Sequence, residues 1–291
     1  TIVPAAVAVF VVLSAWPAIR PTSLRLAWGW SLAASLAVAA GWLLTGVLHC
    51  VASPWSDMLW YGIAELLLCP LIAVLGARRP GVAVWNWFVL IPLLAVLGWP
   101  VAAAAMAGAR PGSFILETPP LAGVLLVLVM GAGNYAGTRF RTSVAALLPA
   151  AVAIILFSLK SAAGLGLSTA SMLAVWCVGA AAAAGWWSGR RPRRGTAGPD
   201  RVWQDFRDQF GIVWAQRIRE RVNERAAQEK WRVRLERSGF VQVDGTPAGS
   251  GELSDPRISQ ALRWLLRRFV DIEWLDARLG VATDTSGPPR E

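Results

Sequence analysis

Residues 57–79 read DMLWYGIAELLLCPLIAVLGARR, and this stretch decides the class of protein. Residues 57–76 are mostly apolar, and two arginines, Arg78 and Arg79, follow almost at once. An α-helix needs about 20 mostly apolar residues to cross the hydrocarbon core of a bilayer. Lysine and arginine concentrate in the loops on the cytoplasmic side of such helices. Residues 57–76 therefore predict a transmembrane helix that ends in the cytoplasm.

The rest of the N-terminal two thirds has the same character. The chain is 55% hydrophobic, with a mean hydropathy of +0.48. Only 16% of its residues are charged, whereas soluble domains carry about 25%. Of the 18 acidic residues, only Asp57, Glu65 and Glu117 precede Gly189. We predict seven spans, at residues 2–19, 26–48, 57–76, 82–107, 120–138, 143–160 and 169–187.

The arginines orient these spans. They occur in pairs in every second connection, and the remaining connections hold at most one basic residue. The positive-inside rule then places the N-terminus outside and the C-terminus in the cytoplasm. One missed or extra span would break this alternation, so the arginines support a count of seven. The pairs are Arg20 with Arg25, Arg78 with Arg79, and Arg139 with Arg141, and the seventh span runs into basic residues 190–194.

Residues beyond 190 are composed differently and hold most of the charge. Apolar residues at helical spacing predict a helix from 200 to about 237. A short strand is indicated within 239–245. A second helix should start with Asp255 as its N-cap and Pro256 at its first position, and Gly280 should end it. We predict a membrane domain (1–189), a basic linker (190–199), a mainly helical cytoplasmic domain (200–280) and a disordered tail (281–291).

The predicted fold class is thus all-α: a multi-pass transmembrane helical bundle of about seven spans with a small, mainly helical cytoplasmic C-terminal domain. Its expected location is the cell inner membrane.

Glu65 is the most unusual residue of the predicted membrane domain. It lies about eight residues into its span, and a carboxylate near the bilayer centre costs roughly 2.5–3.5 kcal/mol on insertion scales. It should therefore face the bundle interior and have a polar partner. It could couple proton movement, anchor a ligand, contact another subunit or simply hydrogen-bond between helices. The candidate intramembrane polar site comprises Glu65, Asn86, Asn134 and Lys160.

The first cytoplasmic helix contains the second candidate site. Its aromatic residues recur at helical spacing, and three arginines continue every fourth residue along it. The aromatic residues should be buried against the second helix or the membrane face, and the surface could dock a partner or contact anionic lipid headgroups. Acidic residues between the arginines also fit an ordinary solvated face. The candidate docking or lipid-headgroup surface comprises Trp203, Phe206, Phe210, Trp214, Arg217, Arg221 and Arg225.

Catalytic motifs are missing from the sequence. His49 is the one histidine, the three cysteines have no metal-site spacing, and HExxH, GxSxG, P-loop and GxGxxG patterns do not occur. We therefore predict no catalytic residue, metal or other cofactor, and no nucleic-acid partner.

The expected function is a non-catalytic membrane subunit or scaffold that assembles a larger complex through its cytoplasmic helices. Its expected partners are other membrane subunits and anionic lipids. The alternative is a proton-coupled transporter or channel that uses Glu65, and an intramembrane enzyme is a third, less favoured class.

Overall fold

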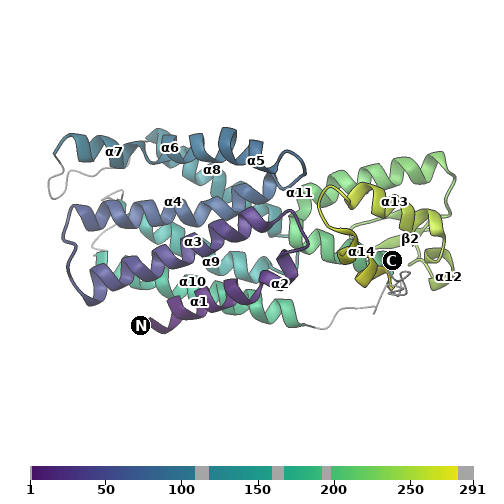
Figure 1. Cartoon of the computed structure of the whole chain (residues 1–291), viewed down its shortest axis with the longest axis horizontal. Coiled ribbons are helices and arrows are strands. Elements are labelled where there is room, and N and C mark those ends of the chain that lie inside the picture. Colours follow the sequence, from purple (N-terminus) through teal and green to yellow (C-terminus); the bar gives the residue numbers. More distant parts are fainter. Residues whose placement is uncertain (1, 109–117, 159–166, 192–197, 281–291) are drawn as a thin grey trace, which may run out of the picture. The chain divides into compact units, whose positions relative to one another are not determined.

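The structure, a computed structural model, describes residues 2–108, 118–158, 167–191 and 198–280, and most of these are helical (Figure 1). They form two compact units, which we describe separately. The N-terminal unit comprises Thr1–Arg20 and Leu24–Arg191. The C-terminal unit comprises Pro21–Ser23 and Pro192–Glu291. Lys160, the predicted tail and most of the predicted linker lie outside the described residues.

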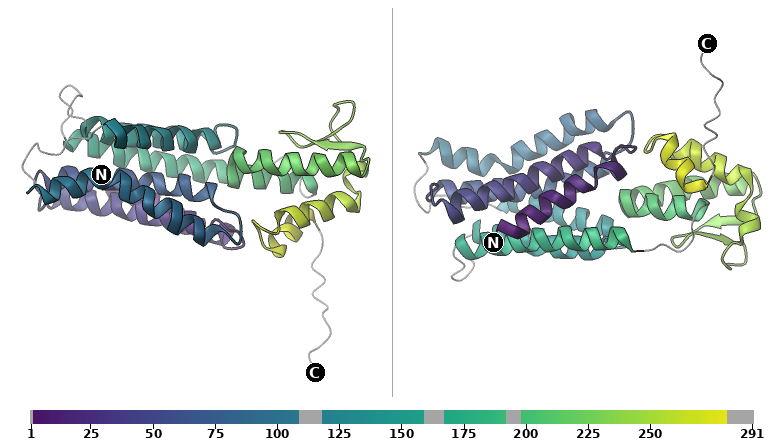
Figure 2. Two further views of the ribbon diagram at one scale, coloured as in Figure 1. Left: turned by 90° about the horizontal axis from the view of Figure 1, so that it is seen from above. Right: turned by 60° about the horizontal axis from the view of Figure 1, so that its bottom comes forward.

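The N-terminal unit is a bundle of helices that lie side by side (Figures 1 and 2). Helix α3 continues through a π-helical turn, Leu43–Val47, and a second π-helical turn, Asn86–Leu90, joins α5 to α6. All seven segments predicted to span the membrane contain helix. The helices are α1 (Ile2–Ser14), α2 (Trp16–Ile19), α3 (Arg25–Trp42), α4 (Trp55–Leu75), α5 (Val82–Trp85), α6 (Ile91–Leu97), α7 (Trp99–Met106), α8 (Thr118–Tyr135), α9 (Arg141–Ser158) and α10 (Leu167–Arg190).

Four helical stretches are long and apolar enough to cross a membrane: Ile2–Ile19, Arg25–Val47, Trp55–Leu75 and Ser168–Arg190. A fifth becomes available if the pair Val82–Leu97 and Trp99–Met106, bent by 46°, counts as one span. The described apolar parts of α8 and α9, Pro120–Tyr135 and Arg141–Ala153, are shorter. The structure therefore confirms a mostly helical protein with helices able to cross a membrane. The count of seven stays a prediction.

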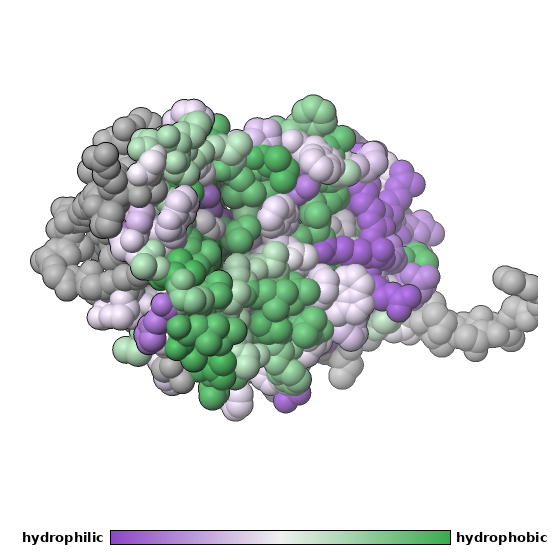
Figure 3. Space-filling model, turned by 60° about the vertical axis from the view of Figure 1, so that its left-hand side comes forward, coloured by the Kyte–Doolittle hydropathy of each residue, from purple (hydrophilic) through white to green (hydrophobic). Residues whose placement is uncertain are grey.

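These helices expose large apolar side chains, as contact with lipid requires. Phe10 is 62% exposed on α1 and Val129 is 70% exposed on α8. Figure 3 shows one face of the molecule on which such residues form a broad apolar surface, drawn in green. In water, an apolar surface of this extent would favour aggregation.

Small residues set the closest contacts inside the bundle. A Cβ on Gly41 of α3 would collide with the Ile63 side chain of α4. A Cβ on Gly179 of α10 would lie 2.5 Å from the Pro4 Cβ of α1. Glycine lets helix backbones approach closely, and van der Waals packing then stabilises the pair within the membrane.

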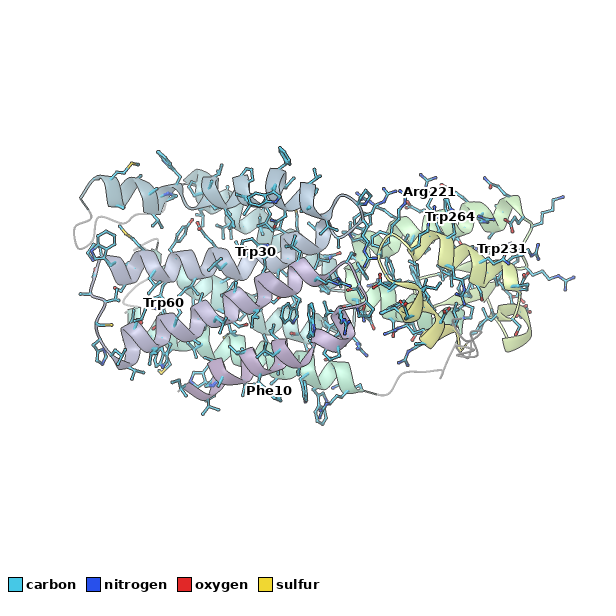
Figure 4. All side chains as sticks on the ribbon, viewed as in Figure 1. Phe10, Trp30, Trp60, Arg221, Trp231 and Trp264 are labelled. Atoms are coloured by element: carbon cyan, nitrogen blue, oxygen red, sulfur yellow. The ribbon has the colours of Figure 1, made fainter. Side chains whose placement is uncertain are left out.

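Tryptophan side chains also join helices within this unit. Trp60 is 1% exposed, and its indole N–H donates to the Thr45 hydroxyl at 3.1 Å (Figure 4). Trp28 donates in the same way to the Val12 carbonyl at 2.7 Å. These indoles therefore satisfy polar groups between helices in a region where water offers few partners.

The C-terminal unit combines helices with a small antiparallel sheet. In the sheet, Val233 pairs with Gln242 and Leu235 with Phe240. Phe206, Phe210, Leu262 and Phe269 are each at most 2% exposed and belong to its core. The elements are α11 (Pro199–Gln228), β1 (Val233–Leu235), β2 (Phe240–Gln242), α12 (Ser250–Leu253), α13 (Pro256–Leu266) and α14 (Ile272–Leu279).

The first predicted helix of this unit was too long. Helix α11 ends at Gln228 rather than near residue 237, because the chain reverses at Lys230 (φ 54°) and enters a β-hairpin. Asn223 on α11 holds the first hairpin strand: its amide donates to the Leu235 carbonyl, and its oxygen accepts from the Leu235 N–H. Helix α11 is itself interrupted at Gly211, whose φ of 79° and ψ of 176° favour glycine.

The second predicted helix is divided in two. The Asp255 carboxylate does cap α13 by accepting from the Arg257 N–H at 2.9 Å, as predicted. Gly280 ends α14 in a left-handed conformation, also as predicted. Between them α13 stops at Leu266 and α14 begins at Ile272. The intervening backbone pairs with a segment from far away in the sequence.

That segment is Pro21–Ser23, the connection between α2 and α3. Ser23 N–H donates to the Phe269 carbonyl at 2.7 Å, and Asp271 N–H donates to the Pro21 carbonyl at 2.8 Å. Thr22, which is fully buried, pairs with Val270 in an antiparallel bridge. A connection between two candidate spans is therefore an internal part of the C-terminal unit.

Candidate functional site

Glu65 lies on the buried face of α4. Glu65 is 8% exposed, and most of the neighbouring residues on α4 are also buried. The expectation that this carboxyl faces the bundle interior agrees with this burial. Its surroundings are set by the bent segment α6–α7.

Helices α6 and α7 break apart at Gly98 because Pro100 has no N–H to continue the helical pattern. The N–H groups of Val101 and Ala102 both donate to the Gly98 carbonyl. The Leu97 carbonyl accepts instead from the hydroxyl of Tyr61, one turn before Glu65 on α4, at 3.0 Å. An α4 side chain thus satisfies a backbone group at the break.

The Glu65 carboxyl packs against the same break. A Cβ on Gly98 would lie 3.3 Å from Glu65 Oε2, so glycine leaves room for the carboxyl. The Tyr61 hydroxyl, which donates to the Leu97 carbonyl, also lies within hydrogen-bonding reach of the Glu65 carboxyl. The other oxygen of this carboxyl, Oε1, is buried, and no atom of the described residues forms a hydrogen bond with it. The arrangement can hold a proton, a cationic group or a hydrogen-bond donor at an interrupted helix.

The other residues of the predicted intramembrane site have different contacts. Asn86 accepts from the Trp30 indole N–H through Oδ1 at 3.0 Å (Figure 4). Asn134 is buried on α8, and Lys160 is outside the described residues. The structure instead brings Glu65 together with Tyr61 and Gly98. The spacing Tyr61–Glu65 and the sequence Gly98-Trp99-Pro100 were the available signals for this grouping.

The aromatic part of the predicted docking surface is not a surface. Trp203, Phe206, Phe210 and Trp214 are at most 7% exposed. Phe206 stacks on Phe210 with ring centroids 4.7 Å apart, and both meet the edge of Phe269. Trp214 meets the same ring at 5.0 Å. These side chains form the core of the C-terminal unit, in agreement with the expectation that they are buried against the second predicted helix, and they do not present a docking face.

The three predicted arginines are mostly engaged along α11. Arg221 pairs with Glu224 at 2.9 Å, and Arg225 with Glu229 at 2.7 Å (Figure 4 labels Arg221). The Arg217 guanidinium lies over the Trp214 ring, 4.9 Å from its centroid. Ion pairs between exposed groups contribute about 0–1 kcal/mol. This face therefore resembles a solvated helix surface more than a free anion site.

An ion pair with a buried carboxylate joins α14 to α11. Arg278, which is half-buried, donates to Asp205 Oδ2 at 2.6 Å and lies 3.8 Å from the Trp274 ring centroid. Burial, with repulsion from Arg201, lowers the pKa of Arg278 to about 10. Arg201 also pairs with Asp205 at 3.4 Å. Asp205 thus has a structural role.

A groove lies beside the interruption of α11. It has a volume of about 650 Å³. Trp203, Ile212, Val213 and Ala215 supply apolar wall. Four arginines and one glutamate give the groove a positive character. The polar lining residues are Arg207, Gln216, Arg217, Arg219, Glu220 and Arg237.

Among the described residues, no group of three or more histidine, cysteine, aspartate or glutamate side chains could hold a metal ion. No protein-family model matches the chain, and no curated protein or solved structure matches it either.

Proposed function

We propose that the chain crosses the membrane seven times, with its N-terminus outside and its C-terminal unit in the cytoplasm. Pro21–Ser23 belongs to the C-terminal unit, so both must lie on the same side of the membrane. The number of crossings between Leu24 and Arg191 must then be even. The four longest apolar stretches leave three crossings in this interval, which is odd, whereas seven spans leave six.

The arginine pattern agrees with this parity. Adding the bent α6–α7 segment alone would give four crossings, also an even number. Counting α8 and α9 as well gives six and places the pair Arg139 and Arg141 on the cytoplasmic side with Arg78 and Arg79. Seven spans therefore satisfy both the parity and the positive-inside rule.

Reporter fusions test this topology. A reporter fused after Gly189 should be cytoplasmic, and one inserted within residues 111–118 should be outside. Phosphatase and fluorescent-protein fusions at the two sites measure the side directly, because the phosphatase is active outside and the fluorescent protein inside. Finding both insertions on one side of the membrane would contradict seven spans.

On this topology, we propose that the protein is a non-catalytic membrane scaffold that holds a partner subunit at the cytoplasmic surface. The pairing of Pro21–Ser23 with Phe269–Asp271 carries this proposal. It gives the C-terminal unit a second attachment to the candidate spans, besides the chain through 192–197. Two attachments limit the motion of a domain and favour binding by reducing the entropy lost on association.

The positive groove beside Gly211 is the proposed partner surface. Its arginines Arg217, Arg219 and Arg237 have no carboxylate within ion-pair distance in the described part of the chain. Acidic side chains on a partner would complement them, and complementary charge favours specificity and association rate. The apolar wall supplies buried area. We propose an acidic, amphipathic segment of another membrane subunit as the occupant.

Reversing two of these charges tests the scaffold. The variant Arg217→Glu/Arg219→Glu should release the protein from a larger complex in cell membranes, and native gels in mild detergent measure this. Arg221→Glu/Arg225→Glu changes the same charge on the same helix outside the groove and should leave the complex intact. A parent protein that migrates at its own mass would contradict the scaffold.

The geometry around Glu65 favours one second function, a proton-coupled transporter or channel. Transport sites often lie near the bilayer centre at interrupted helices. Glu65 lies against the break at Gly98 and has one oxygen without a hydrogen bond among the described residues. A variant that separates the two functions is treated in the Discussion.

A further inference from the structure

Four exposed side chains occur in the stretch where α13 ends and α14 begins, and we call them the interfacial patch: Trp264, Arg267, Arg268 and Ile272. Trp264 is 53% exposed and Ile272 is 51% exposed (Figure 4 labels Trp264). Both arginines are exposed. The Arg267 guanidinium lies 5.4 Å from the Trp264 ring centroid. Exposed apolar side chains of this size need an explanation in a domain that otherwise buries its aromatics.

The backbone pairing locates this patch. Phe269–Asp271, between Arg268 and Ile272, bonds to Pro21–Ser23. The candidate span Ile2–Ile19 precedes Pro21–Ser23 in the sequence, and the candidate span Arg25–Val47 follows it. A connection as short as residues 20–24 between two spans must lie at the membrane surface. The paired residues, and the side chains next to them, must then lie there too.

We propose that the interfacial patch binds the headgroups of anionic phospholipids in the cytoplasmic leaflet. This inference rests on the proposed topology, and it moves lipid contact away from Arg217, Arg221 and Arg225. Indole rings favour the depth of the headgroups, and Ile272 follows directly after Asp271, which bonds to Pro21, and adds an exposed apolar side chain. Guanidinium groups bind phosphate oxygens in a bidentate manner.

The charges of the patch distinguish it from the α11 face. Arg267 and Arg268 form no ion pair within the described ranges, whereas Arg221 and Arg225 are each paired with a glutamate. Basic residues near an anionic membrane surface are attracted to it. Glu273 is exposed beside the patch and opposes it. Neutralising this carboxylate should therefore strengthen headgroup binding.

Spin labels in nanodiscs of the full chain test the position and the ligand together. The label is placed by Ile272→Cys in a Cys50→Ser/Cys177→Ser background, because Cys50 is exposed, Cys177 is half-buried and only Cys69 is buried. Val243→Cys is the matched control, since Val243 is an exposed aliphatic residue of the same unit, at 73%. Leu36→Cys on α3 reports on the span itself. Collisions with oxygen and with a water-soluble nickel chelate measure the depth of each label.

With phosphatidylglycerol present, the label at 272 should collide several-fold less with nickel than the label at 243. The label at 36 should favour oxygen. Pure phosphatidylcholine, or Arg267→Gln/Arg268→Gln, should remove most of the protection at 272. Arg221→Gln/Arg225→Gln should leave it, and Glu273→Gln should increase it.

Two results overturn the inference while the topology stands. The first is a water-accessible label at 272 together with an oxygen-accessible label at 36. The second is equal protection at 272 in both lipid compositions, which excludes anionic headgroups as the ligand. A water-accessible label at 36 overturns the proposed topology and this inference with it.

Discussion

Replacing Phe210 with aspartate should unfold the C-terminal unit at ordinary temperatures. Phe210 is fully buried between Phe206 and the edge of Phe269. Losing a buried phenyl ring costs about 3–5 kcal/mol, and a carboxylate buried without a partner adds to this cost. The sum is comparable with the whole stability of a small domain, about 5–15 kcal/mol. Phe269 also carries the carbonyl that binds Ser23, so the second attachment should be lost as well.

Proteolysis of the full chain in detergent measures this outcome, because an unfolded C-terminal unit is cut within α11 and α13. Val243→Asp introduces the same charge at an exposed position and should leave the cleavage pattern unchanged. Phe210→Leu keeps an apolar side chain and should lose only part of the stability. If Phe210→Asp resists protease as well as Val243→Asp does, the aromatic cluster is not the core of this unit.

The helices that are long and apolar enough to cross a membrane could be predicted from the sequence, because this property is local. About 20 mostly apolar residues in a row predict a span, and arginines at its ends predict its direction. Pro100 is a local signal for the break between α6 and α7, because proline lacks the N–H that a continuing helix needs. The hydrogen bond from Tyr61 to the Leu97 carbonyl at this break could not be predicted, because packing brings together residues that are 36 positions apart in the sequence.

The C-terminal unit shows the limits of periodicity. Apolar residues at helical spacing correctly indicated the apolar face of α11, and this face was expected to pack on the second helix, on the membrane or on a partner. The sequence alone did not decide among these, and in the structure Phe269 covers the face. Exposure is a property of the assembled fold, so an amphipathic helix alone cannot tell a core from a docking surface.

The remaining differences also arise from contacts distant in sequence. Both ends of the predicted helix over 256–280 were correct: Asp255 caps α13, and Gly280 ends α14. The helix is divided because Phe269–Asp271 pairs with Pro21–Ser23, and three residues near the start of the chain give no local sign of that pairing. The same contact supplies the parity argument for the topology.

Replacing Glu65 separates the scaffold from the transporter. Glutamine has nearly the size of glutamic acid and can hydrogen-bond with Tyr61, but it cannot exchange a proton. If Glu65 is structural, Glu65→Gln should keep the thermal stability of the parent in detergent. Glu65→Ala should lose an interhelical contact, at about 0.6–2 kcal/mol in membranes. The scaffold further requires that Glu65→Gln restore function fully in cells that lack the native chain.

Tyr61→Phe completes the comparison. It removes the hydroxyl that binds the Leu97 carbonyl, so it should destabilise the bundle whether or not protons move. If Glu65 and Tyr61 act only as structural partners, Glu65→Ala and Tyr61→Phe should cost less together than the sum of their separate costs. A Glu65→Gln protein that is as stable as the parent but inactive in cells would contradict the scaffold. That result would assign the Glu65 carboxyl to proton-coupled transport. Glu65→Ala and Tyr61→Phe should lower the stability, whereas Glu65→Gln removes only the exchangeable proton.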